Sequence, residues 1–365
     1  MFSRFHYALN RGMRDVAMRF MSRFPDRKEI GHFDIRKQKI DKILLARPNF
    51  RMGNSILAIP GIHFFRKNFP NARIDFVGSP ISKVLFQNLP IDHHYEVTRG
   101  FLESSWCYPG LVRRLRSARY ELAVELSCSQ SALGAFVVGL SGAKWRAGRK
   151  GKWDFWYNVK LGKPQEKNKY RLPSALLASL GLEVEETYPA MLLSPLEKRI
   201  GQEKLKALGQ EKDGATVGVF VGGRHRLGKR WSSDGFAQLI SKLATRGVRT
   251  VVFFGPEERD LIRFFKDHLA PDVPLVYEPS LRLFAAMVAN CQLFVTSDSG
   301  PMHLACALGV RTVAIFQRPD VDRWAPPPCL AQIVYEPRGV SVETVETACL
   351  TELSQMELSG KAHQL

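Results

Sequence analysis

The sequence has few cysteines, no long apolar run and a shortage of acidic residues. Its six cysteines include no Cys-x-x-Cys pair, which excludes a zinc ribbon and a thioredoxin-like site. Cysteines inside apolar runs of a chain this large predict reduced, intracellular thiols. The longest apolar run, residues 132–140, is about half of the roughly 20 residues that a membrane span needs. The N-terminus also lacks the uninterrupted apolar core of a secretory signal.

The acidic shortage is large: 53 Lys and Arg stand against 35 Asp and Glu, a net charge of +18. Such an excess favours a negatively charged partner, which is nucleic acid, anionic lipid or a phosphorylated substrate. The 365 residues, of which 45% are apolar, are enough for two separate cores.

Residues 1–38 are predicted to be a basic amphipathic extension. Their apolar residues recur at steps of three and four, as on one side of a helix, and most arginines lie off that stripe. Such a helix either lies in a membrane interface or packs its stripe on the protein body. A mitochondrial presequence is less favoured, because acidic residues interrupt the segment. The stripe consists of Phe5, Leu9, Met13, Val16, Phe20 and Phe24.

Short apolar runs that suit buried strands alternate with helical patterns along residues 39–190 and again along 191–340. This alternation predicts an α/β fold with two Rossmann-like, doubly wound domains. The polar segment 183–199, which contains two Pro residues, is predicted to connect them near residue 190. A helix and tail are predicted at 341–365. Ligands of such sheets bind at the carboxyl ends of strands, here expected in the cleft between the halves.

The strongest signal lies at residues 295–305, where an apolar strand pattern ends in Asp298-Ser299-Gly300 and Pro301 opens a helix. Backbone amides of the first turn, together with the helix dipole, would form a phosphate cradle. Met302 and His303 follow in that turn. The alternative is an ordinary capped helix, but this segment carries more polar groups than capping needs.

Two further loops follow predicted strands. The first contains Gly222 and continues through basic residues to Lys229 and Trp231, and Lys229 can neutralise a diphosphate leaving group. The second contains Glu257 and Glu258, whose carboxylates can accept hydrogen bonds from ribose hydroxyls. The alternative for these acids is a stabilising place at a helix N-terminus.

These loops occur in an order that resembles glycosyltransferase family 9, the heptosyltransferases of lipopolysaccharide core assembly. That family shows Lys-x-Trp after a glycine loop, Gly-x-x-Glu after the next strand, and Asp-Ser-Gly-Pro-x-His-x-Ala at a helix start. Asp320, Arg323 and Trp324 continue the likeness, which covers roughly residues 40–355. The matching segments are Lys229-Arg230-Trp231, Gly255-Pro256-Glu257-Glu258 and residues 298–305.

The resemblance implies the GT-B architecture and inverting transfer without a metal or other cofactor. It also implies an ADP-linked sugar donor, with heptose as the expected sugar, and a lipopolysaccharide-core or related anionic glycolipid as acceptor. We therefore expect a cytoplasmic enzyme at the cytosolic face of the inner membrane, in peripheral contact with anionic lipid. The predicted donor residues are Gly222, Lys229, Trp231, Glu257, Glu258, Asp298, Ser299, Gly300, Met302 and His303.

One departure from the family concerns the general base. Family members commonly carry an acid after the glycine of the first loop, but here Gly53 is followed by Asn54. An amide cannot take a proton at neutral pH, so Asn54 either orients the acceptor or marks a non-catalytic member. Glu125, after a later strand, is the predicted substitute base. The alternative for Glu125 is a structural carboxylate, and His63 and Asp298 are further candidates.

Residues 144–153 interleave bases with tryptophans, a pattern that also occurs in nucleic-acid-binding loops. Because this segment lies in the family's acceptor domain, an anionic glycolipid is the favoured partner and no nucleic acid is expected. Individual residues can also belong to a solvated loop. The predicted acceptor-binding residues are Arg51, Arg146, Arg149 and Lys150.

Overall fold

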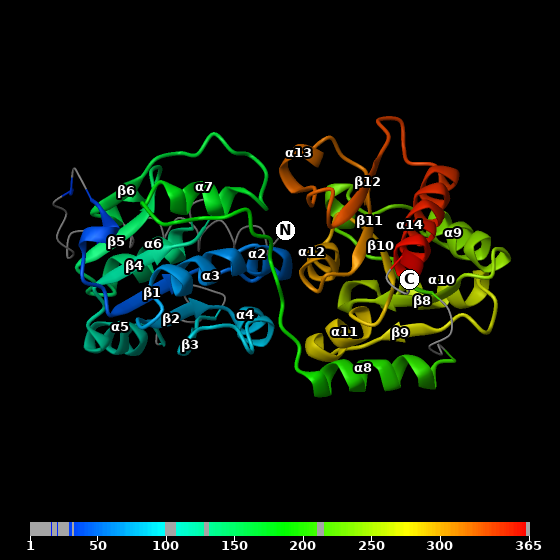
Figure 1. Cartoon of the computed structure of the whole chain (residues 1–365), viewed down its shortest axis with the longest axis horizontal. Helices are drawn as coiled ribbons and strands as arrows, with labels where there is room; N and C mark the ends of the chain where they lie inside the picture. Colours follow the sequence, from blue (N-terminus) through cyan, green and yellow to red (C-terminus); the bar gives the residue numbers. More distant parts are fainter. Residues whose placement is uncertain are drawn as a thin grey trace. The chain divides into compact units, whose positions relative to one another are not determined.

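The computed structural model describes residues 16, 20, 29–30, 33–98, 107–127, 131–209 and 215–362. The chain divides into two compact units, one ending at Tyr188 and the other beginning at Pro189. Each unit is a sheet with helices packed on it (Figure 1). The predicted N-terminal stripe lies mostly outside the described residues. Its two described members, Val16 and Phe20, are 70% and 60% exposed.

The N-terminal unit contains a six-stranded sheet in the order β3-β2-β1-β4-β5-β6, and every neighbouring pair is parallel. The strands are β1 (Lys42–Ala46), β2 (Arg73–Gly78), β3 (His93–Glu96), β4 (Leu122–Glu125), β5 (Trp145–Arg149) and β6 (Val159–Leu161). The helices are α2 (Met52–Ile56), α3 (Ile59–Asn68), α4 (Pro80–Leu85), α5 (Cys107–Ala118), α6 (Ala132–Leu140) and α7 (Leu172–Ala178), with 3-10 turns η1 (Ile35–Lys37) and η2 (Asp154–Trp156).

The C-terminal unit contains a second parallel sheet of six strands, in the order β12-β11-β10-β7-β8-β9. The strands are β7 (Thr216–Phe220), β8 (Arg249–Phe254), β9 (Leu275–Tyr277), β10 (Leu293–Ser297), β11 (Arg311–Phe316) and β12 (Ala331–Tyr335). The helices are α8 (Pro195–Ala207), α9 (Ser233–Thr245), α10 (Leu261–His268), α11 (Leu281–Val288), α12 (Gly300–Ala307), α13 (Val321–Trp324) and α14 (Val342–Ala362), with 3-10 turns η3 (His225–Leu227) and η4 (Pro256–Glu258).

The two sheets have the same topology, because the second order read backwards repeats the first with each number raised by six. This is the doubly wound order, in which strand order reverses at one point in each sheet. The reversal lies between β1 and β4 in one unit and between β7 and β10 in the other. Ligands bind at the carboxyl ends of strands at such a point. The predicted α/β fold with two Rossmann-like domains is confirmed.

Both faces of the central strands are buried, as parallel sheets require. Ile43, Leu44 and Leu45 of β1 have no exposed surface, and the same holds for Val217 and Val219 of β7. Their continuous apolar runs explain why these strands could be predicted from the sequence.

Two segments differ from the sequence-based prediction. The basic and aromatic segment 144–153 contains strand β5, and its residues Trp145 and Trp153 are 6% and 5% exposed, so they belong to the core. The predicted polar connector 183–199 contains the start of α8. Ser194 and Glu197 form a capping box there, with Pro195 in the first turn, and this combination strongly favours a helix start.

Candidate active site

Loops that follow neighbouring strands of the C-terminal unit come together at its strand-order reversal. Because β7 and β10 pair in parallel, with Thr296 opposite Phe220, the segments that follow them leave the sheet at the same edge. The Trp231 backbone N–H donates to Ser297 Oγ at 3.0 Å and joins the two segments. Arg318, after β11, donates to the Leu227 carbonyl at 3.1 Å and adds a third segment.

Lys229 lies at the centre of this group. Its Nζ contacts Asp298 Oδ2, lies 3.0 Å from Asp320 Oδ2 and sits 5.4 Å from the centroid of the Trp324 ring. The Lys229 and Asp298 side chains are only 12% and 7% exposed. Burial raises the pKa of Asp298, and the neighbouring Lys229 opposes this shift. The Lys229 ammonium has three N–H donors and is partly buried. It is suited to bind an anionic ligand in place of one of its two carboxylate partners.

The start of α12 lies beside this cluster. Ser299 is the N-cap residue, its Oγ accepts from the Met302 N–H at 3.4 Å, and Thr296 Oγ1 lies 3.1 Å from the same oxygen. Ser299 and Gly300 are partly exposed, whereas Met302 and His303 are buried. Burial lowers the pKa of His303 to about 3, and Lys229 adds to the shift, so its imidazole is neutral at pH 7. Met302 and His303 therefore pack beneath the surface and support the first turn of α12.

Glu258 ties two glycine loops together. Its carboxylate accepts from the Gly223 N–H at 3.4 Å and from the Gly255 N–H at 3.1 Å, and the side chain is 5% exposed. A Cβ on Gly222 or Gly255 would lie 2.6 Å from this carboxyl group. Burial raises the pKa of Glu258, and the backbone N–H groups oppose this shift. Glu258 is thus committed to the backbone, whereas Glu257 is exposed.

Trp231 is likewise part of the scaffold. Its indole N–H donates to the Val340 carbonyl at 3.0 Å, and its ring packs edge-on against Phe236 at 5.0 Å. Of the predicted donor residues, Lys229, Ser299 and Gly300 are therefore brought together with partly exposed surface, beside the buried Asp298. Asp320 and Trp324 were missing from the predicted donor set. Their place directly after β11 is the signal that could have included them, since β11 neighbours β10.

The corresponding reversal in the N-terminal unit carries different groups. The loop after β1 is organised by Asn49, whose Oδ1 accepts from the Arg51 N–H at 3.0 Å and from Asn54 Nδ2 at 3.3 Å. Ser79 Oγ donates to the Asn49 carbonyl at 2.6 Å and joins this loop to the end of β2. Asn54 is partly exposed and Arg51 is exposed, so both side chains can meet a ligand.

Glu125, the predicted substitute base, ends β4 and has no exposed surface. The Tyr157 hydroxyl donates to its Oε2 at 2.9 Å, and a Cβ on Gly134 of α6 would lie 2.8 Å from its side chain. Burial raises the pKa of Glu125 to about 7, against the opposing influence of Ser127 and Arg47. The carboxylate is covered in this structure, which argues against direct contact with an acceptor.

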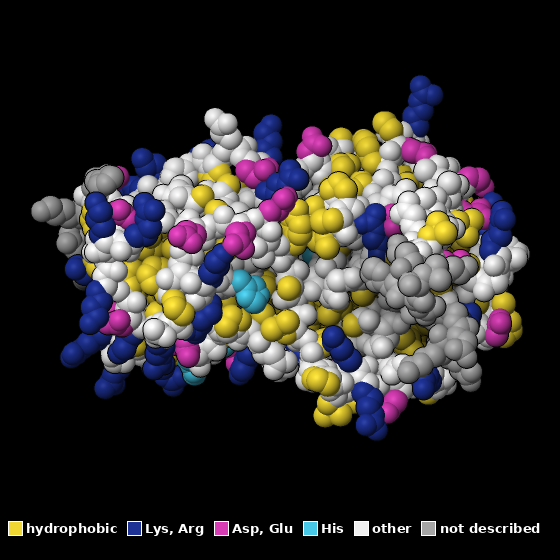
Figure 2. Space-filling view, viewed as in Figure 1, with side chains coloured by type: hydrophobic (Ala, Val, Ile, Leu, Met, Phe, Trp, Pro, Cys, Tyr) yellow, Lys and Arg dark blue, Asp and Glu magenta, His cyan; other side chains and the backbone are white. Residues whose placement is uncertain are grey.

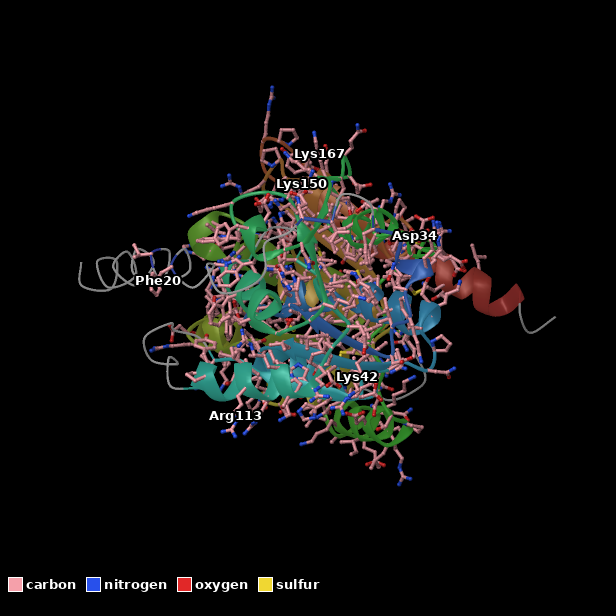
Figure 3. All side chains as sticks on the ribbon, turned by 90° about the vertical axis from the view of Figure 1, so that its left-hand side faces the viewer. Phe20, Asp34, Lys42, Arg113, Lys150 and Lys167 are labelled. Carbon is pink, nitrogen blue, oxygen red and sulfur yellow. The ribbon has the colours of Figure 1, made fainter. Side chains whose placement is uncertain are left out.

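The predicted acceptor-binding arginines and lysine separate into two groups. Arg146 is 6% exposed, and its guanidinium donates to the carbonyls of Ala143 and Trp156 at 3.0 and 3.4 Å. It therefore joins the segment before β5 to η2. Lys150 is exposed and Arg149 partly so, at the carboxyl end of β5. Lys150 and Lys167 lie in the upper part of the face in Figure 3, and Lys42 and Arg113 in its lower part.

The two units of Rossmann-like topology define the GT-B architecture, and the C-terminal unit carries a lysine and two carboxylates where β7, β10 and β11 end. The chain belongs to glycosyltransferase family 9 (heptosyltransferase), whose family model matches residues 110–355. The expected family and the expected glycosyltransferase class are thereby confirmed.

Relatives with assigned activities are similar over most of the chain. Lipopolysaccharide heptosyltransferase 3 of Escherichia coli is 24% identical, over 75% of this chain and 83% of that protein. Lipooligosaccharide heptosyltransferase 2 of Campylobacter jejuni is 22% identical, over 75% of this chain and 80% of that protein.

Solved structures agree on the fold. A family 9 glycosyltransferase of Veillonella parvula superposes with a TM-score of 0.76 at 19% identity, covering 87% of this chain and 99% of that one. E. coli ADP-heptose lipopolysaccharide heptosyltransferase II gives a TM-score of 0.71 at 20% identity, with coverages of 87% and 99%. No helix among the described residues is long and apolar enough to cross a bilayer.

Proposed function

We propose that this protein transfers a heptose from an ADP-linked donor to a lipopolysaccharide-core or related glycolipid, with inversion and without a metal or other cofactor. The observation that carries the proposal is the buried contact of Lys229 with Asp298 and Asp320, where β7, β10 and β11 end. The names of the relatives support the choice of heptose and of a lipopolysaccharide acceptor.

On the donor side, Lys229 would leave its carboxylate partners for the diphosphate. An ammonium beside the scissile bond stabilises the charge that develops on the leaving group. Ser299 and Gly300, at the start of α12, add backbone N–H groups and the positive end of the helix dipole. Asp298 is then released to accept hydrogen bonds from the sugar hydroxyls.

On the acceptor side, Asn54 would orient the attacking hydroxyl, and Arg51, Arg149 and Lys150 would bind acidic groups of the glycolipid. Arg146 and Glu125 would not contact the acceptor directly, because Arg146 is bound to backbone carbonyls and Glu125 is fully buried. Glu125 instead holds Tyr157. The Tyr157 ring fills the space beside Gly148, where a Cβ would lie 2.3 Å from it. Glu125 thereby positions the segment that carries Arg149 and Lys150.

The test is a transfer assay with purified full-length protein, ADP-heptose and a heptose-deficient lipopolysaccharide acceptor, with and without EDTA. We expect acceptor-dependent release of ADP that EDTA does not abolish. Binding of ADP-heptose without turnover would instead establish the non-catalytic alternative, which Asn54 and the buried Glu125 favour. A salt-sensitive gel shift with RNA or DNA, without sugar transfer, would establish a nucleic-acid-binding protein.

The acceptor of this reaction is anchored in a membrane, so we also propose action at the cytosolic face of the inner membrane. The apolar stripe of the N-terminal segment and the net charge of +18 support interfacial contact with anionic lipid. Deleting residues 1–30 should leave a folded enzyme that sediments less with anionic vesicles. Loss of folding would show that the stripe belongs to the core.

A further inference from the structure

Exposed large apolar side chains are concentrated at one helix of the C-terminal unit. Among the described residues, eight such side chains are exposed, and four of them lie between positions 192 and 208. The others are dispersed at Val16, Phe20, Leu227 and Leu358. The four members of this group, which we call the α8 patch, are Leu192, Leu196, Ile200 and Leu208, exposed by 42%, 65%, 38% and 37%.

The outward direction of Leu196 and Ile200, the two members of the patch within α8, follows from the contacts on the opposite side of the helix. Gly201 faces α11 so closely that a Cβ would lie 2.3 Å from the Ala286 carbonyl oxygen. Glu197 accepts from Arg282 Nε and from one of its terminal nitrogens at 2.6 and 2.7 Å. Because residues four apart share a helix face, Leu196 and Ile200 point together away from this contact. The helix has one apolar face that is buried and a second one that is exposed.

Basic side chains flank the exposed face. Arg199, Lys204 and Lys206 are all exposed. The two acids of the helix are in ion pairs, Glu203 with Arg199 at 3.0 Å and Glu197 with Arg282 at 2.6 Å. Figure 2 shows hydrophobic and basic atoms side by side along the lower edge, over α8. An apolar stripe bordered by lysines and arginines is the composition of a helix that lies in a lipid interface.

We propose that α8 is a docking surface for an anionic phospholipid bilayer. The apolar stripe would enter the headgroup region, and the flanking bases would meet lipid phosphates. The net charge of +18 supports a lipid surface over a second copy of this chain, because two such copies repel each other whereas an anionic surface attracts either. The inference rests on the proposed function only in taking the acceptor to be membrane-bound.

The experiment uses the full-length chain and vesicles of phosphatidylglycerol and phosphatidylcholine. The double variant Leu196→Ser/Ile200→Ser should lower the partition coefficient about tenfold, since both side chains would lose burial in lipid. The matched control is Leu358→Ser, which changes an exposed leucine of α14 and should leave partitioning unchanged. Lys204→Glu/Lys206→Glu should also weaken binding to the vesicles. The matched control is Arg263→Glu/Lys266→Glu, which makes the same change of charge on α10 and should weaken binding less.

Hydrogen–deuterium exchange of the unaltered protein locates the contact independently of the variants. We expect anionic vesicles to slow exchange in residues 192–208 and to leave that of α14 unchanged. The proposal is overturned if the protein binds vesicles without protection of α8, or if the serine variant partitions like the parent. If light scattering shows that the parent is a dimer and the serine variant is a monomer, the patch is an interface with a second copy of the chain. Transfer to a detergent-dispersed acceptor tests the proposed function separately, and the α8 variants should retain it.

Discussion

The two strand-order reversals have the same topology but differ in how charged side chains are arranged around them. In the C-terminal unit, a cation and two carboxylates lie together with some surface exposed, around Lys229. In the N-terminal unit, the acid at the equivalent strand end, Glu125, is fully buried and Arg47 is buried as well, whereas Arg51 and Lys150 lie on exposed loops. The first arrangement suits one ligand of fixed geometry, such as a diphosphate, and the second suits an anionic ligand of variable shape.

The largest effect is expected at Lys229. Replacing it with alanine removes the charged donor and leaves Asp298 and Asp320 facing each other, so donor binding or turnover should weaken by about 1–3 kcal/mol. Calorimetry with ADP and steady-state kinetics measure the two quantities. Arg230→Ala, in the next position of the same loop, is the control for a general loss of positive charge. Unchanged affinity and turnover in Lys229→Ala would show that Lys229 does not bind the diphosphate.

The next effect concerns the missing acid of the N-terminal unit. Asn54 is partly exposed at the strand-order reversal, so Asn54→Asp places a carboxylate where a base can act, and turnover should rise about tenfold or more. Asn54→Ala should lower turnover modestly, because the orienting amide is lost. Donor affinity, measured in parallel, should stay constant in both variants. A fall in turnover for Asn54→Asp would mean that the amide itself is required.

A smaller change tests whether Trp231 is scaffold. Trp231→Phe keeps most of the ring but loses the hydrogen bond to the Val340 carbonyl, which should cost about 1 kcal/mol of unfolding free energy. Denaturant titration measures this loss. The Michaelis constant for the donor should not change, whereas a direct donor contact through the indole would raise it.

The smallest effect at neutral pH is expected for Glu125→Gln. Burial raises the folded-state pKa of Glu125 to about 7, from a usual value of 4.5, so its contribution to stability is complete below the usual value and is lost as pH rises through 7. Glutamine does not ionise, so the melting temperature of the variant relative to the parent should increase from about pH 5 to pH 8. Turnover should fall less than tenfold. A loss of 100-fold or more, with donor affinity intact, would restore the base role.

The sequence predicted which loops of the C-terminal unit meet better than it predicted the structure of residues 144–153, for a physical reason. Lys229 and Asp298 follow continuous apolar strands, and parallel pairing alone brings such loops to one edge. The roles of Arg146 and Trp145 depend on whether residues 144–153 form a strand. Two glycines and five basic residues conceal β5 from any periodicity argument. The strand pairs with β4 and β6, and the Trp145 ring packs against Phe33 with 5.7 Å between the ring centroids.

The helix at the end of the predicted connector was missed for a related reason. The start of α8 carries Ser194, Pro195 and Glu197, a helix-start signature, within a segment whose polarity predicts a loop. Its buried face is formed by small and apolar residues that pack on α11, a helix far away in the sequence. Packing against a helix distant in the sequence is not detectable from the local sequence pattern, so the two faces of α8 were found only in the structure.

The contact of Glu258 with its glycine neighbours has a consequence for how this protein can change over generations. Its carboxyl group occupies the space that a side chain on Gly222 or Gly255 would need, and it serves N–H groups of both loops. A side chain gained at either glycine collides with it, and a shorter residue at 258 leaves buried donors unserved. Replacement at any one of the three positions therefore disturbs the contacts of the other two. We expect their effects on stability to be coupled rather than additive.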